Sequence, residues 1–168
     1  MLTLNRKTEY ALVSLCYLEQ QREAGETVVS AQKIAEAFHL PLPLLMNILK
    51  QLRRAGFVRS TRGATGGYSL DRDASLIVLL EILEVMEGPV QLTPCTADSE
   101  KLEEAGIALE EECCMLDYCP VHQAINRLHH RIEDFLRDVS LADLVHSSVD
   151  VTVSTIRSTV CANKELVS

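Results

Sequence analysis

The feature that most constrains the fold is a helical segment that ends at a glycine and is followed by two short strands around a glycine-rich turn. Apolar residues at helical spacing continue up to Ala55, and Gly56 then stops the helix. The turn is rich in residues that tolerate a positive φ, which favours a tight hairpin. The expected elements are helices over residues 4–22 and 31–38, a third helix ending at 55, strands over 57–62 and 68–70, and a turn over 63–67.

This order of elements predicts a mainly α protein with a small β-hairpin wing, that is, a winged helix-turn-helix. In such a fold the third helix enters the major groove, and the hairpin reaches the DNA backbone or the minor groove. Asn47 can pair with an adenine edge, and the neighbouring cations suit phosphate. A winged helix that binds proteins instead of DNA is the alternative. The candidate DNA-binding residues are Asn47, Lys50, Arg53, Arg54, Arg59, Arg62, Gly63, Thr65 and Gly66.

The net charge of −8 is unusual for a protein that binds DNA, but the charge is unevenly distributed. Residues 1–75 hold 10 Lys and Arg against 7 Asp and Glu, a net charge of +3, whereas residues 76–168 carry −11. The N-terminal part can therefore face phosphate, and the C-terminal part would be repelled by it. We expect a DNA-binding domain over 1–75, dimerisation helices with a Cys-rich loop over 76–146, and a tail over 147–168.

The C-terminal part combines two helices with an acidic loop between them. A nearly continuous apolar run predicts a helix over 75–87, residues 91–119 resemble a loop, and a long helix is expected from 119 to 139. Apolar residues in the long helix follow a heptad spacing, which is typical of a coiled-coil seam and predicts a homodimer. Packing of the same face within one chain is the alternative. The seam residues are Val121, Ile125, Leu128, Ile132, Phe135 and Val139.

Three cysteines and a histidine, Cys95, Cys113, Cys119 and His122, lie in or next to the loop. Thiolates with an imidazole are ligands for an iron–sulfur cluster and equally for tetrahedral zinc. A third possibility is a metal-free site in which the thiols themselves are oxidised. Cys16 lies in an apolar helical stretch, where a free cysteine behaves as a small hydrophobic residue.

The run from Leu49 to Leu70, and above all Arg62-Gly-Ala-Thr-Gly-Gly67, resembles the wing signature of the Rrf2 family of bacterial regulators. The resemblance extends over about residues 1–145. It implies a homodimer that binds a palindromic operator in double-stranded DNA, with the long helix crossing onto the partner. It also implies that the cluster loop lies near the partner's DNA-binding domain.

Family members that hold a cluster carry three cysteines between the two core helices, and Cys95, Cys113 and Cys119 match them. The resemblance implies a 2Fe–2S rather than a 4Fe–4S cluster, with His122 or Glu9, the latter from the other protomer, as fourth ligand. The spacer between Cys95 and Cys113 holds 17 residues, longer than in such relatives, so Cys114 is an alternative to Cys95.

The start of the recognition helix, residues 41–46, also departs from the family, because it is apolar where relatives offer polar base readers. Leu44 or Met46 is therefore expected to contact thymine methyl groups.

Taken together, the sequence predicts a cytoplasmic homodimeric repressor, not an enzyme, whose DNA affinity is controlled by a cluster that senses redox state, iron or nitric oxide. The alternative is a metal-free or zinc-binding regulator of the same fold that responds to thiol oxidation or to a partner protein. No membrane span is expected, because no apolar run approaches about 18 residues. The charged residues near the start are unlike an export signal.

Overall fold

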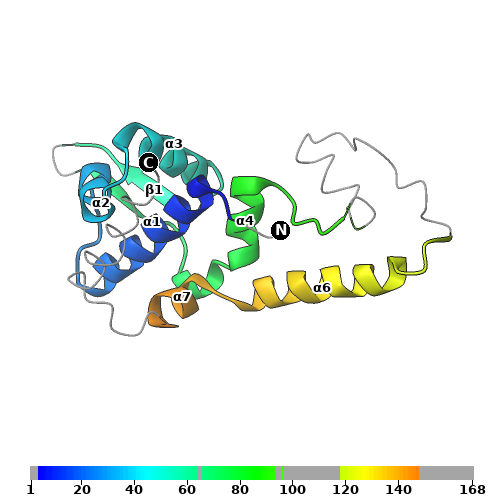
Figure 1. Cartoon of the computed structure of the whole chain (residues 1–168). Coiled ribbons are helices and arrows are strands. Elements are labelled where there is room, and N and C mark those ends of the chain that lie inside the picture. Colours follow the sequence, from blue (N-terminus) through cyan, green and yellow to red (C-terminus); the bar gives the residue numbers. More distant parts are fainter. Residues whose placement is uncertain (1–3, 64–65, 94–95, 97–117, 148–168) are drawn as a thin grey trace, which may run out of the picture.

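The computed structural model describes residues 4–63, 66–93, 96 and 118–147, and its fold is the mainly helical winged helix-turn-helix that the sequence predicts. Figure 1 shows a body built from the N-terminal helices and the hairpin, with one long helix that projects away from it. The elements are α1 (Arg6–Glu23), α2 (Ala31–Phe38), α3 (Leu42–Arg54), β1 (Val58–Thr61), β2 (Gly67–Leu70), the 3-10 turn η1 (Ala74–Leu76), α4 (Leu79–Glu87), α6 (His122–Asp138) and α7 (Leu141–Ser147).

The helix-turn-helix is defined by local capping. The Ser30 hydroxyl accepts a hydrogen bond from the backbone N–H of Lys33 and caps the start of α2. His39 ends the same helix in the left-handed region at φ 52°, and Pro41 then precedes α3. Pro43 falls in the first turn of α3, where its missing N–H costs no helical hydrogen bond. The turn between α2 and α3 is therefore set by a few consecutive residues.

The hairpin is tied to the loop before α2 by a third backbone segment. β1 and β2 pair antiparallel with Val58 opposite Leu70 and Thr61 opposite Gly67. Val29 exchanges two backbone hydrogen bonds with Tyr68, at 2.9 and 2.8 Å, on the other edge of β2. A Cβ on Gly67 would overlap the backbone of Val29, so glycine at this position is needed for a close approach of two backbones.

A single hydrophobic core joins the N-terminal helices to the segments that follow the hairpin. α1 packs against α3, α4, α7 and β2, and its buried residues include Ala11, Leu15 and Leu18. Ile82 of α4 and Leu141 of α7 are completely buried in the same cluster. The domain boundary near residue 75 remains a prediction, and the core is continuous across that point.

The helix expected over residues 75–87 is interrupted. Ile77 and Val78 are extended, and α4 begins only at Leu79. The reason is a short backbone pairing with the segment after α6: the Leu141 N–H donates to the Ile77 carbonyl at 2.7 Å, and the Leu79 N–H donates to the Val139 carbonyl at 2.8 Å. These long-range bonds replace helical ones at two β-branched residues, which have little helix preference.

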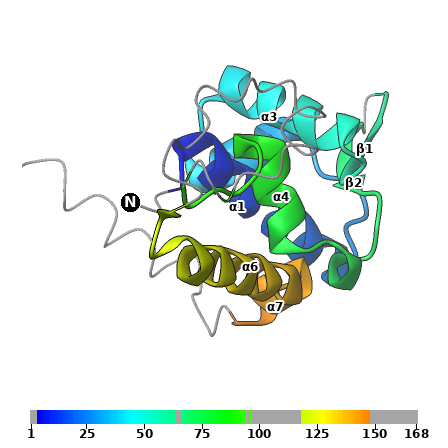
Figure 2. The same ribbon diagram turned by 90° about the vertical axis from the view of Figure 1, so that its right-hand side faces the viewer.

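α6 begins at His122, three residues later than the sequence suggested, and runs to Asp138. It packs against α4, and Figure 1 shows that its N-terminal end lies far from α2 and the hairpin. Figure 2 shows α6 below α4, on the side away from α3. α7 then returns to α1, and the side chains of Ser140 and Asp143 cap its start reciprocally. The Ser140 hydroxyl, and then the Ser140 backbone N–H, donate to the Asp143 carboxylate and lower its pKa. Among the described residues, no helix is long and apolar enough to cross a membrane.

Substituting Gly67 by alanine should destabilise the fold by about 2 kcal/mol, because the added Cβ forces the backbones of β2 and Val29 apart. Gly25→Ala is the matched control: it has open space around the Cβ but a φ of +91°, so only a conformational cost of about 1 kcal/mol is expected. Urea denaturation of both variants measures the difference. Equal stability of Gly67→Ala and the unmodified protein would show that the close approach is not required.

Candidate functional site

The cationic side chains that the sequence assigned to DNA are exposed on α3 and the hairpin. Lys50, Arg53 and Arg54 lie on the solvent side of α3, together with Asn47, while the opposite side of the helix is buried. Arg59 and Arg62 are exposed on and just after β1. Thr65 lies outside the described residues, and Gly63 and Gly66 flank it at the tip of the hairpin.

Local hydrogen bonds hold two of these arginines in place. An Arg53 Nη1 donates to the Ser60 hydroxyl at 3.3 Å and links α3 to β1, and the Arg59 Nε donates to the Ser69 hydroxyl at 3.0 Å across the hairpin. Within the described part of the chain, none of the five cations on this surface has a carboxylate in ion-pair range. A row of uncompensated positive charge on one face suits a polyanion.

The first turn of α3 is apolar, and the structure separates its exposed residues from its buried ones. Leu45 is completely buried, and Leu44 is half-buried and packs against the core. Leu42 and Met46 are 40% and 43% exposed. Of the two residues expected to contact thymine methyl groups, Met46 is therefore free to do so, and Leu44 is largely occupied by packing. Leu42 was not identified from the sequence, because its place on the outer side of the helix depends on where α3 begins.

Two of the proposed metal ligands, Cys119 and His122, are described, and they lie together at the start of α6. Cys119 is a half-buried free thiol, and its carbonyl accepts a 3.4 Å hydrogen bond from the backbone N–H of His122. The Nδ1 of His122 is buried and has no hydrogen-bond partner among the described residues. A buried imidazole nitrogen normally has a hydrogen bond or a metal, so this atom fits a ligand role.

The other proposed ligands are placed differently. Cys95, Cys113 and Cys114 lie outside the described residues, and within the described ones no group of three or more His, Cys, Asp or Glu side chains could hold a metal ion. Glu9 is exposed in the first turn of α1, on the body of the molecule, whereas α6 begins at the far end (Figure 1). Within one chain, the structure does not bring Glu9 to His122.

Cys16 occupies the interior position that the sequence predicted. It packs against the core in α1, and burial raises the pKa of its thiol to about 11. The thiolate is the reactive form of cysteine, so Cys16 is a poor nucleophile and a poor redox sensor at neutral pH.

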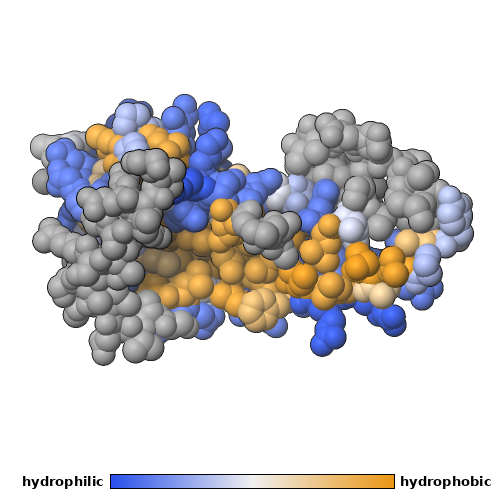
Figure 3. Space-filling view, in the orientation of Figure 1, coloured by the Kyte–Doolittle hydropathy of each residue, from blue (hydrophilic) through white to orange (hydrophobic). Residues whose placement is uncertain are grey.

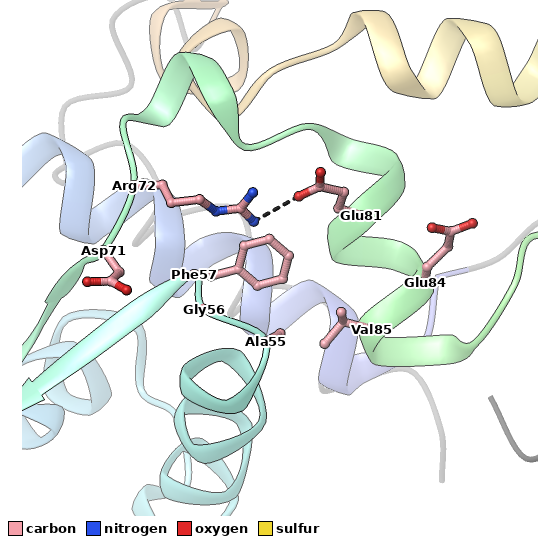
Figure 4. Close-up of a pocket in the computed structure, with 8 residues that line it drawn as sticks. All are labelled: Ala55, Gly56, Phe57, Asp71, Arg72, Glu81, Glu84 and Val85. Carbon is pink, nitrogen blue, oxygen red and sulfur yellow. Dashed lines mark hydrogen bonds and ion pairs between the residues drawn. The ribbon is translucent and has the colours of Figure 1, made fainter. Parts of the chain in front are cut away.

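A pocket lies between the end of α3, the segment after β2, and α4 (Figure 4). None of the residues that line it was predicted from the sequence to have a function. The Arg72 guanidinium lies over the Phe57 ring, 4.9 Å from its centroid, and an Arg72 Nη2 donates to Glu81 of α4 at 2.8 Å. Phe57 itself follows α3 and is almost completely buried. The cation–π contact and the ion pair thus link the end of α3 to α4, and no local sequence pattern indicates this contact.

An exposed apolar face runs along α6 and continues onto α4. Figure 3 shows hydrophobic atoms along much of the length of α6 and across to the neighbouring helix. Val121, Leu128 and Phe135 are 55%, 48% and 67% exposed, and Val85 of α4 is 38% exposed. Leu128 and Phe135 of α6, and Val121 immediately before it, belong to the predicted heptad seam. A contiguous exposed apolar patch of this kind usually marks an interaction surface.

The helix-turn-helix, the hairpin wing and the uncompensated cations define a winged-helix protein of the DNA-binding class. Comparison with known proteins identifies the family. Residues 4–147 match the model of the Rrf2 family, described as an iron-dependent transcriptional regulator, and the chain belongs to this family. It is a transcriptional regulator and not an enzyme.

Individual relatives agree with this assignment. The chain is 31% identical over 144 residues to the HTH-type transcriptional regulator IscR of Photorhabdus laumondii, a match that covers 86% of this chain and 79% of the relative. Two solved structures are similar in fold. CymR, the global cysteine regulator of B. subtilis, has a TM-score of 0.66 at 27% identity over 88% of this chain and 99% of its own. T. potens IscR has a TM-score of 0.62 at 27% identity over 87% and 88%.

Proposed function

We propose that this regulator is a homodimeric repressor that binds a palindromic operator through α3 and the hairpin. Its DNA affinity would be controlled by an iron–sulfur cluster held at the start of α6. The observation that carries the DNA-binding part is the row of exposed cations on α3 and on and just after β1, none of which has a carboxylate in ion-pair range in the part of the chain that the structure describes. The observation that carries the cluster part is the buried Nδ1 of His122, which has no hydrogen-bond partner among the described residues, three positions after the free thiol of Cys119.

The DNA-binding part rests on charge and position. Lys50, Arg53 and Arg54 lie along the exposed side of α3, and Arg59 and Arg62 extend the cationic surface onto the wing. Phosphate contacts of this kind fix the register of a protein on DNA, and base contacts add the sequence preference. Repression would follow from occupying a site that the transcription machinery also needs.

The homodimer is supported by the apolar face of α6. Phe135 is an aromatic side chain that is two-thirds exposed. Leu128 precedes it by one heptad in α6, and Val121, the N-cap residue of the helix, precedes Leu128 by another. Exposure of such an apolar face to water is unfavourable. Packing against α6 of a second copy would bury the face and stabilise the dimer. Pairing of two identical chains about a two-fold axis also matches the symmetry of a palindrome.

The cluster assignment agrees with the donor chemistry of the described ligands. Cys119 supplies a thiolate and His122 an imidazole, and the remaining thiolates would come from Cys113 and from Cys95 or Cys114. Glu9 of the partner subunit competes with His122 for the fourth position. A bound 2Fe–2S cluster would supply a redox-active group. It could signal by gaining or losing an electron, or by being lost from the protein. The family's description as iron-dependent and the similarity to IscR support this choice over zinc.

The transmission of the signal would use α4. This helix contacts α6 on one side and α1 and α3 on the other, and Arg72 with Glu81 links it to the end of the recognition helix. Cluster ligation at Cys119 and His122 would hold the start of α6 in one position. A coupling free energy of about 1–3 kcal/mol between the two sites is enough to change operator occupancy strongly.

The second candidate is a metal-free regulator of the same fold that responds to thiol oxidation or to a partner protein. It is favoured by the structural similarity to CymR, the global cysteine regulator of B. subtilis, and by the 17-residue spacer between Cys95 and Cys113. In that case Cys113, Cys114 and Cys119 would be the reactive thiols, since Cys16 is held protonated by burial.

The role of the wing in DNA binding can be tested with Arg62→Ala. Loss of one phosphate contact should weaken binding to all sequences and should reduce the slope of log K against log salt by about 0.9. Fluorescence anisotropy with duplex DNA at several salt concentrations measures both quantities. The control is Arg137→Ala, which removes an exposed arginine of α6 that is paired with Asp134 at 3.0 Å. Equal effects of the two substitutions would contradict the assignment of the wing.

The dimer seam can be tested with Phe135→Glu. A charge placed in the apolar face of α6 should dissociate the homodimer, because a buried unpaired carboxylate is costly. Light scattering after gel filtration measures the molar mass. Asp134→Ala is the control, since this neighbouring side chain is 70% exposed and does not belong to the heptad seam. A dimer that persists unchanged in Phe135→Glu would place the interface elsewhere.

The cluster can be tested by absorption spectroscopy with iron and sulfide analysis of protein purified without oxygen. We expect a coloured, iron-containing protein that loses its colour in Cys119→Ala and keeps it in Cys16→Ala. His122→Ala should give a more labile cluster or a shifted spectrum if the histidine is the fourth ligand. A colourless, iron-free protein would instead favour the second candidate.

A further inference from the structure

The exposed side of α3 changes its chemistry along the helix. No polar side chain occurs from Leu42 to Met46, and the exposed residues there are Leu42, Pro43 and Met46. Leu42 and Met46 lie one helical turn apart on the same face. Asn47 is the first exposed polar side chain of the helix, and the exposed cations begin only at Lys50. Figure 3 shows hydrophobic atoms at the surface over the region of α2 and α3, next to hydrophilic ones.

The position of this apolar pair determines what it can meet on DNA. In a helix-turn-helix, the N-terminal residues of the recognition helix contact base edges, and residues nearer its C-terminal end lie closer to the backbone. Leu42 and Met46 therefore occupy the positions where base contacts are made, and the cations occupy those of phosphate contacts. The 5-methyl group of thymine is the apolar group that the major groove presents.

We propose that Leu42 and Met46 select thymine at the centre of each half-site through its methyl group, and that Asn47 contacts the adenine of a neighbouring A·T pair. This inference rests on the proposed function, because it requires that α3 enter the major groove. Apolar contacts with thymine methyl groups would then provide most of the base selectivity of this regulator. Half-sites rich in A·T pairs under the start of α3 are the expected ligands, with little hydrogen-bond readout before Asn47.

The packing of α3 decides which side chains take part. Leu45, Ile48, Leu49 and Leu52 are buried and hold the helix on the body, so they are not available to DNA. Leu44 is half-buried among core residues. Met46 has a flexible, polarisable side chain that adapts to a methyl group, and Leu42 offers a second apolar surface one turn earlier.

The test begins with the full-length protein, purified without oxygen, and a library of random duplex DNA from which bound sequences are selected. The selection is repeated after iron removal with a chelator, so that either cofactor state can supply the operator. Each thymine of the selected half-site is then replaced by uracil, which removes only the 5-methyl group. Binding of each duplex is measured by fluorescence anisotropy for the unmodified protein, Met46→Ala and Leu42→Ala.

We expect about a fourfold loss of affinity for each contacted methyl that is removed, the effect of burying one such group. Met46→Ala should bind the thymine and uracil duplexes equally at one position, and Leu42→Ala at another. Met46→Leu should restore the preference for thymine, which a merely structural role would not do. Leu76→Ala is the control, because Leu76 is an apolar side chain, 65% exposed, that lies outside α3.

Specific binding with no loss on any uracil duplex would overturn the methyl readout and leave the proposed function intact. A methyl preference that is unchanged in both Met46→Ala and Leu42→Ala would also overturn it. Selection that enriches no sequence in either cofactor state would contradict DNA-specific regulation itself, and the inference would fall with it.

Discussion

The fold depends on the burial of α1, which is in contact with nearly every other part of the body. Leu15 and Ala11 are completely buried, and α3, α4, α7 and β2 all pack against this helix. Since α1 supplies one surface to both the DNA-reading elements and the helices that follow the hairpin, the two cannot move as wholly separate units. Backbone hydrogen bonds pair Ile77 with Leu141 and Leu79 with Val139. They hold the C-terminal end of α6 beside the start of α4, and the rest of α6 extends away from the body (Figure 1).

In this arrangement the proposed DNA-binding surface and the proposed cluster site lie far apart. The cationic surface lies on α3 and the hairpin, and the start of α6, with Cys119 and His122, lies at the opposite end (Figure 1). Within the chain, α4 joins them through the contact of Arg72 with Phe57 and Glu81. The partner subunit of the proposed dimer would supply a second route. The dimer route would also explain why the exposed apolar face lies along α6, between the two ends. A ligand that reorients the start of α6 would act on both routes.

Much of this architecture follows from local sequence patterns, and the exceptions have physical reasons. Ser30 before α2 and Gly56 after α3 are local signals, and α2 begins and α3 ends beside them. The break at Ile77 and Val78 could not be anticipated, because it comes from hydrogen bonds between residues that lie 60 and 64 positions apart in the chain. The exposure of the cations on α3 followed from helical periodicity, whereas the contact of Arg72 with Phe57 depends on tertiary packing and has no sequence pattern. The ligand set of the cluster remains a prediction, of which Cys119 and His122 are the described members.

The central claim is that the state of a cluster at the start of α6 controls the affinity of α3 and the wing for DNA. The most direct measurement is the Kd for a selected operator duplex, determined on one anaerobic preparation before and after the iron is removed. The account predicts that the two Kd values differ by about tenfold or more, while circular dichroism shows that the fold is retained. Equal Kd values for the iron-containing and the iron-free protein would contradict it.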